Sequence, residues 1–260
     1  MRQVAPPPPD HSWRTLYTLA QLGGFDVVGS IVDPATRLSG AVTLGTDGVL
    51  TVPLSGGWAA AGFSTTAQTV DPGTDGVYLC FPLYHRSGSR VSGDVAVDTH
   101  VRVRAPALVA ADDVAIAYGL ANDSTLAGLT VDSVLAVAEW HNATGIRSRA
   151  QGITNGVAAA LSNGGTAGPT GRGGETRMGK GGKGGGTSSG LRLGVGNNLI
   201  DADGVPVFNT GANPVAGIAS VGTGDLWLVV ALWRTNAANV TAKSVAVTVE
   251  LGDIAMTSYA

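Results

Sequence analysis

The sequence lacks the features that mark a disulfide-stabilised or membrane-spanning protein. Its single cysteine, Cys80, excludes an internal disulfide, and its place in the apolar run 77–81 predicts a buried structural thiol. No apolar stretch approaches the ~18–20 residues that span a bilayer. No hydrophobic signal segment follows the N-terminus. We therefore expect no association with a membrane.

Charge is also scarce. Charged residues make up 13% of the chain, against about 25% in a typical soluble protein. The net charge of −3 argues against a general nucleic-acid-binding surface. Apolar residues reach 44%, so the chain is expected to fold rather than stay disordered. With few charges to solvate its surface, it is expected to bury much of that surface against copies of itself or a partner.

Groups that could carry catalysis are few. The only glutamates are Glu139, Glu175 and Glu250, and no two of them have the spacing of a paired-carboxylate glycosidase site. Glu139 and His141 share one face of an expected strand, where a surface pair is favoured over catalysis. The four histidines show no metal-ligand spacing with one another or with Cys80. We therefore expect no enzyme activity, no metal and no cofactor.

Three short motifs resemble known sites but lack essential parts. Residues 174–180 spell G-x-x-x-x-G-K, yet Gly181 stands where a phosphate-binding loop needs a hydroxyl. Residues 186–190 match G-x-S-x-G without the strand before and the helix after that a nucleophile elbow requires. Residues 201–204 resemble part of a calcium loop without its distal glutamate. None of them predicts a site.

The sequence does contain many short apolar runs punctuated by turn residues. Residues 226–233 are apolar at every position, and residues 244–251 alternate apolar with polar. The alternating run predicts a strand with one wet face, whereas the uniform run predicts a strand covered on both faces. Further strands are expected at 27–32, 40–44, 49–54, 77–83, 95–104, 114–120, 134–141, 191–195, 205–208 and 254–257. Strands at this spacing predict an all-β fold, an antiparallel β-sandwich of jelly-roll type.

Two segments depart from this pattern. Residues 1–24 are expected to form an extended arm containing Pro6, Pro7, Pro8 and Pro9, followed by a short helix. Residues 25–260 are expected to form the sandwich, interrupted at about 162–190 by a long glycine-rich surface loop. The basic residues of that loop are Arg172, Arg177, Lys180 and Lys183. They are expected either to be solvated or to order on an acidic partner.

One expected strand carries a charged face. In residues 95–104, valines and a threonine alternate with Asp98, His100, Arg102 and Arg104. This face is interpreted first as a solvated outer surface. The same groups would also suit an acidic ligand or a contact between subunits.

This combination of many short strands, low charge, a proline arm, a glycine-rich loop and no active site resembles virion structural proteins of tailed bacteriophages. The resemblance implies a non-enzymatic head-decoration or tail subunit, located in the virion, that forms a homotrimer and docks on the major capsid or tail protein. The interface would involve Pro6–Pro9, the basic loop residues, and Trp227 and Trp233 of the uniform apolar run.

The alternative function is a carbohydrate-binding receptor-recognition module. It would present an exposed aromatic platform to a host surface glycan, and Trp58 and Trp140 are its candidate contacts, with Trp233 a further one. A hydrolase, the third class considered, would need two converging carboxylates.

Overall fold

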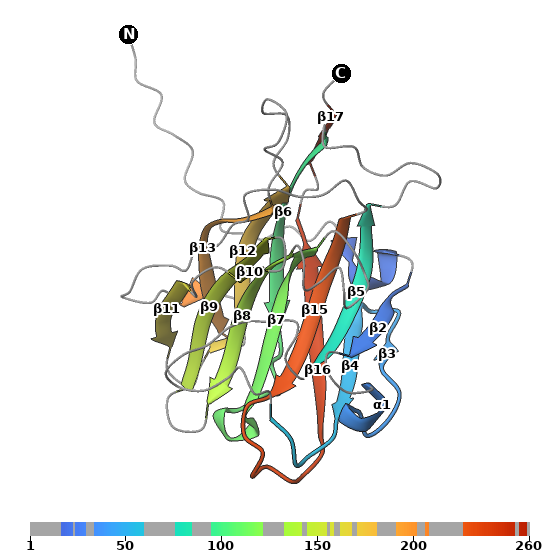
Figure 1. Cartoon of the computed structure of the whole chain (residues 1–260), viewed down its shortest axis with the longest axis vertical. Helices are drawn as coiled ribbons and strands as arrows, with labels where there is room; N and C mark the ends of the chain where they lie inside the picture. Colours follow the sequence, from blue (N-terminus) through green and yellow to red (C-terminus); the bar gives the residue numbers. More distant parts are fainter. Residues whose placement is uncertain are drawn as a thin grey trace.

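The fold is described from a computed structural model of the chain, in which strands form most of the structure (Figure 1). The helical elements among the described residues are short: the 3-10 helices η1 (Leu19–Leu22) and η2 (Ala110–Asp112), and α1 (Pro34–Arg37). The described residues are 17–22, 24–29, 34–59, 76–84, 95–121, 133–141, 145–154, 157–158, 162–167, 171–180, 191–201, 206–207, 226–252 and 255–258.

The strands form two antiparallel sheets that lie face to face as two layers (Figure 1). The nine-stranded sheet has the order β14 (Pro206–Val207), β13 (Leu191–Asp201), β12 (Gly171–Lys180), β6 (Val95–Arg104), β16 (Lys243–Leu251), β4 (Val49–Leu54) and β3 (Thr43–Leu44), with β1 (Tyr17–Thr18) beside β16 and β17 (Ala255–Ser258) beside β6.

The eight-stranded sheet has the order β10 (Val157–Ala158), β9 (Gly145–Thr154), β8 (Ser133–His141), β7 (Val114–Ala121), β15 (Leu226–Arg234), β5 (Val77–Tyr84) and β2 (Asp26–Gly29), with β11 (Ser162–Ala167) beside β9. The predicted antiparallel β-sandwich is therefore confirmed.

The two C-terminal strands lie in different layers. Strand β15 is central in the eight-stranded sheet, between β5 and β7. Its residues 228–233 are all 0% exposed, so the predicted two-sided cover is achieved within one chain. Strand β16 lies in the other sheet, where Val245, Val247, Val249 and Leu251 are buried and the residues between them are half-buried or exposed. The alternating and uniform patterns thus predicted both environments correctly.

The prediction of one glycine-rich surface loop at 162–190 is wrong for two parts of that segment. Residues 162–167 form β11, and residues 171–180 form β12, which pairs with β6 on one side and β13 on the other. Pairing on both sides satisfies the backbone hydrogen bonds of β12 without requiring large apolar side chains. Residues 181–190 lie outside the described part of the chain.

The turn Asp47-Gly48 connects β3 to β4 as predicted. Gly48 has a φ of +81°, a left-handed conformation that favours glycine. The Asp47 carboxylate accepts a hydrogen bond of 3.1 Å from the Val49 amide. At the N-terminal side, the expected short helix is reduced to η1, whose Leu19 is buried in the core.

Candidate functional site

The strand register places a row of polar residues directly across five strands of the nine-stranded sheet. Thr18 of β1 lies opposite Glu250 of β16, and Glu250 lies opposite Arg102 of β6. Arg102 lies opposite Glu175 of β12, and Glu175 lies opposite Asn198 of β13. Strands lie about 4.8 Å apart, so these five residues, called here the cross-strand row, span about 19 Å.

The row lies on the outer face of the sandwich. On β6, Val101 and Val103 are buried in the core, whereas Arg102 and Arg104 between and after them are half-buried. Because directly opposite residues share a face of a sheet, the other members of the row belong to that outer face as well. Thr18 and Glu250 are likewise half-buried. The alternation predicted for residues 95–104 is confirmed at these positions.

Two arginines share one carboxylate in this row. The Nη2 atom of Arg104 donates a hydrogen bond to Glu250 Oε1, and Nη1 of Arg102 lies 3.7 Å from Glu250 Oε2. The side chains of Arg102 and Glu250 are 12% and 13% exposed, while that of Arg104 is 27% exposed. The three groups together carry one excess positive charge. They offer guanidinium donors and carboxylate acceptors side by side.

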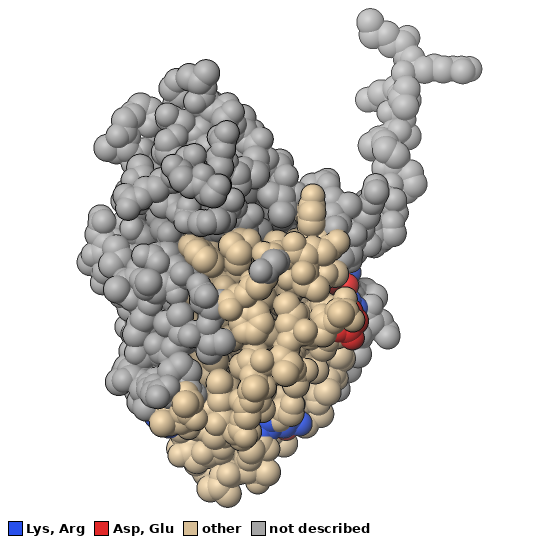
Figure 2. All heavy atoms as spheres, turned by 90° about the vertical axis from the view of Figure 1, so that its right-hand side faces the viewer, with Lys and Arg blue, Asp and Glu red and all other residues tan. Residues whose placement is uncertain are grey.

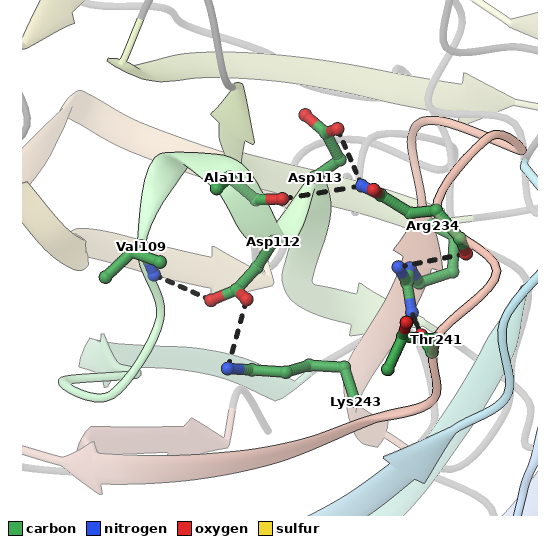
Figure 3. A network of polar contacts seen from close by, with 8 residues as sticks. Val109, Ala111, Asp112, Asp113, Arg234, Thr241 and Lys243 are labelled. Carbon is green, nitrogen blue, oxygen red and sulfur yellow. Dashed lines mark hydrogen bonds and ion pairs between the residues drawn. The ribbon is translucent and has the colours of Figure 1, made fainter.

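A second polar cluster ties three loops together (Figure 3). Arg234, the last residue of β15, is 2% exposed. Its Nη1 atom donates to the backbone carbonyl of Thr241 at 3.0 Å and to that of Ser55 at 3.4 Å. Its Nη2 atom donates to the backbone carbonyl of Asn239 at 3.4 Å. Burial lowers the pKa of Arg234, and the nearby carboxylates of Asp112 and Asp113 offset part of that effect.

Asp113 is the second centre of this cluster. It is 5% exposed and has a φ of 46°, in the left-handed region that aspartate tolerates better than most residues. Its carboxylate accepts hydrogen bonds from the side-chain amides of Asn236 at 3.2 Å and Asn239 at 2.7 Å. Asp112 next to it forms an ion pair of 3.0 Å with Lys243. These contacts hold the 105–113 and 235–242 loops together, as a structural anchor.

Two of the three predicted aromatic contacts, Trp58 and Trp233, are buried. Trp58 is 5% exposed, its Nε1 donates to the Ser55 carbonyl at 2.9 Å, and the Arg37 guanidinium lies 5.1 Å from its ring centroid. Trp233 is 0% exposed and meets Tyr78 edge-on at 5.5 Å. Neither ring offers a glycan platform, and the proposed interface role of Trp233 is wrong because the chain itself buries this residue.

The other predicted residues fall in several places. Trp227 is half-buried against the core. Trp140 lies on β8, opposite Ile146. The basic residues Arg172, Arg177 and Lys180 lie on β12 and not on a loop, because that strand pairs on both sides. Pro6–Pro9 and Lys183 lie outside the described residues.

The alternation of β6 predicts the Asp98–Arg104 face from the sequence, but no sequence pattern predicts the cross-strand row. The row depends on the pairing of β6 with β12 and β16, which are far apart from it in the chain.

The described residues offer neither a metal site nor a membrane-spanning helix. None of their His, Cys, Asp and Glu side chains form a group of three or more able to hold a metal ion. No helix in that part of the chain is long and apolar enough to cross a membrane.

Neither a family model nor a curated protein sequence matches the chain. Solved structures similar to it include a legume lectin-like domain from Entamoeba histolytica, at 6% identity, covering 89% of this chain and 91% of that chain with a TM-score of 0.44. The CBM2 module of an evolved Dit from Lactobacillus casei BL23 phage J-1 has 12% identity, coverages of 92% and 93%, and a TM-score of 0.46. An endo-1,3-beta-glucanase from Streptomyces sioyaensis has 11% identity, coverages of 95% and 98%, and a TM-score of 0.42.

Proposed function

We propose that this chain is a non-catalytic carbohydrate-recognition module that binds a glycan along the cross-strand row. The supporting observation is the row itself, a series of hydroxyl, carboxylate, guanidinium and amide residues on one sheet face. Sugar hydroxyls both donate and accept hydrogen bonds. A ligand that carries many of them suits a surface on which donors and acceptors alternate at about 4.8 Å.

The character of this face favours a polar ligand over a protein partner. The buried centre of a protein interface is rich in aromatic and apolar residues and poor in charge. The exposed large hydrophobic residues in the described part of the chain are Tyr17, Val109 and Val240, and the last two lie in loops at the far end. On the proposed surface, Thr18, Arg102 and Glu250 are half-buried polar residues.

The burial of β15 removes one argument that the chain assembles with copies of itself. Because the strand is uniformly apolar, its outer face was expected to be covered, and a second copy of the chain could have covered it. Since residues 228–233 are fully buried in the single chain, no partner is needed to account for them.

Binding of full-length protein to soluble polysaccharides in affinity gel electrophoresis tests the proposal. The panel contains a β-glucan, a mannan, a xylan and a polyuronate. Retardation by at least one polymer is expected, and Arg102→Gln and Asn198→Ala are each expected to weaken it about tenfold, the effect of one lost hydrogen bond to a charged or polar ligand group.

The matched control is Lys243→Gln, which also removes one positive charge but lies in the far loop cluster. Each variant is compared with the parent by its melting temperature, so that loss of binding is distinguished from loss of folding. Absence of binding to every polymer, or equal weakening by Lys243→Gln, would overturn the proposal.

A structural role in a virus particle is the second candidate, favoured by the low charge of the described surface. On the side drawn in Figure 2, most of the described surface is uncharged and charged groups occupy only small areas of it. Such a surface suits burial between copies. A homotrimer would then form, held in part by the arm with Pro6–Pro9, and would bind the capsid or tail protein of the virion.

The mass of the protein in solution tests this role, measured for the full-length chain and for a chain that lacks residues 1–12. A monomer in both cases would argue against it.

A further inference from the structure

The surroundings of Arg104 indicate which class of glycan this face would bind. Arg104 lies two residues after Arg102 on the same face of β6, and its side chain is 27% exposed. Within the described residues its side chain makes one hydrogen bond, to Glu250, and the buried Nε atom makes none. Glu250 also lies near Arg102, which has further interactions of its own. Arg104 therefore pairs with this one carboxylate and keeps guanidinium N–H groups that bond to no described residue.

The register sets a glycine beside this arginine. On β12 the residue directly opposite Arg104 is Gly173, which has no side chain. On β16 the residue opposite is Thr248, which is half-buried and has a hydroxyl group. An anionic group that approached Arg104 from the β12 side would meet no side chain at position 173, and the Thr248 hydroxyl would lie on the other side.

We propose that the face binds an acidic glycan, and that Arg104 is the residue that recognises its anionic group. This inference rests on the proposed carbohydrate function and specifies its ligand class. Arginine presents its N–H groups as a fork that matches the two oxygens of a carboxylate or sulfate. The anion would lie over Gly173, while sugar hydroxyls would follow the row. Glu250 keeps the guanidinium in place and is not itself a ligand for the anion.

The proposed binding depends on the positive charge of Arg104 and not on the net charge of the protein. The chain carries a net charge of −3, so long-range attraction does not draw a polyanion to it. The contact depends instead on charges within a few ångströms, and salt weakens such exposed interactions over a Debye length of about 8–10 Å. Binding is therefore expected to weaken as sodium chloride is raised from 50 to 500 mM, roughly tenfold for a small number of ionic contacts.

The experiment measures binding of the full-length chain to four polymers: a polyuronate, a sulfated galactan, and the neutral dextran and β-glucan. Binding to one of the acidic polymers, with little or none to the neutral ones, is expected. Arg104→Gln is expected to weaken it about tenfold to a hundredfold, because a hydrogen bond to a charged group is lost. The carboxylated and sulfated polymers distinguish the two sources of the anion.

Two variants make the result independent of the charge of the protein. Gly173→Val leaves all charges unchanged but adds a side chain directly opposite Arg104. Valine is favoured in strands, so the protein is expected to fold and to lose binding. Lys243→Gln removes one positive charge elsewhere and is expected to bind as the parent does.

The possible outcomes separate the two proposals. Binding to acidic polymers that is lost in Arg104→Gln and Gly173→Val supports both. Binding to neutral polymers that neither variant changes overturns the acidic ligand but leaves the carbohydrate function standing. Binding to none of the polymers overturns both. Equal loss in Lys243→Gln would show a nonspecific charge effect and would overturn the assignment to Arg104.

Discussion

The side-chain amide of Asn239 donates a hydrogen bond of 2.7 Å to the carboxylate of Asp113, 126 residues earlier in the chain. The contact joins the loop that carries the chain from the eight-stranded to the nine-stranded sheet to the loop between β6 and β7. Arg234 contacts the same loop through the carbonyls of Asn239 and Thr241. The cluster therefore anchors one end of the sandwich, where the chain changes layers.

Replacing Asn239 by alanine is expected to destabilise the fold by about 1–3 kcal/mol, since it leaves the 5% exposed Asp113 carboxylate with one donor fewer. The free energy of unfolding from urea titration gives the measurement. Ala237→Ser, at an exposed position of the same loop, is the control and is expected to change stability by less than about 0.5 kcal/mol. A loss for Asn239→Ala no larger than that of the control would show that the bond has no net effect.

Arg234 makes a larger contribution because it is almost fully buried and its donors serve three backbone carbonyls. Arg234→Met keeps a long apolar side chain but removes every donor, and it removes the guanidinium charge near Asp112 and Asp113. We expect a loss of about 3 kcal/mol or more in the free energy of unfolding.

Arg234→Lys is the informative partner of that variant. It retains a positive charge near the two aspartates but replaces the fork with a single ammonium group. Its loss of stability is expected to lie between those of the parent and Arg234→Met, measured by the same titration. Equal losses for the two variants would mean that donor geometry matters and the charge does not.

Local patterns predicted much of the fold because each strand with a distinct environment carries its own signal. The alternation of β16 and the uniform run of β15 correctly predicted one half-covered and one fully covered strand. The bounds of β4 and β6 agree with the predicted ranges 49–54 and 95–104. The turn at Gly48 was visible because its positive φ requires a small residue.

What the sequence could not reveal depends on contacts between distant strands. Strand β12 has glycines at positions 171, 173, 174 and 179 and a single β-branched residue, Thr176, so it shows no apolar alternation. Its strand conformation comes from pairing with β6 and β13. The cross-strand row has the same origin: residue types at positions 18, 102, 175, 198 and 250 show no common pattern until the register aligns them. Burial of Trp58 and Trp233 likewise depends on tertiary packing.

Hydrogen exchange can test the assignment of β12. A glycine-rich loop would exchange its amide protons almost as fast as an unfolded peptide. A strand paired on both sides has its amides in backbone hydrogen bonds and exchanges only through opening of the sheet. We expect residues 173–180 to be protected to an extent comparable with residues 99–104 of β6, measured by mass spectrometry. The exposed loop 236–238 is the unprotected reference, and exchange of β12 at its rate would contradict the pairing.

The close approach of two loops leads to a last prediction, at Gly56. A Cβ atom built on Gly56 would lie 1.9 Å from the carbonyl oxygen of Val240, which is backbone and cannot move without displacing the loop. The amide of Gly57 also donates to the Asn239 carbonyl at 3.0 Å, so the two loops are held at this distance. Gly56→Ala is therefore expected to cost about 2 kcal/mol or more, the range of overpacking in a fixed structure.

Gly40→Ala provides the matched control for that substitution. The nearest atom to its added Cβ would be Pro53 Cγ at 3.6 Å, an ordinary van der Waals contact, and its φ is not in the left-handed region. Reduced freedom of the unfolded chain makes such a change neutral or slightly stabilising, by about 0.4–1 kcal/mol. Thermal unfolding should therefore give a lowered melting temperature for Gly56→Ala and an equal or raised one for Gly40→Ala. Equal melting temperatures for the two variants would show that the loops are free to separate, and the anchor at Arg234 would then not hold them together.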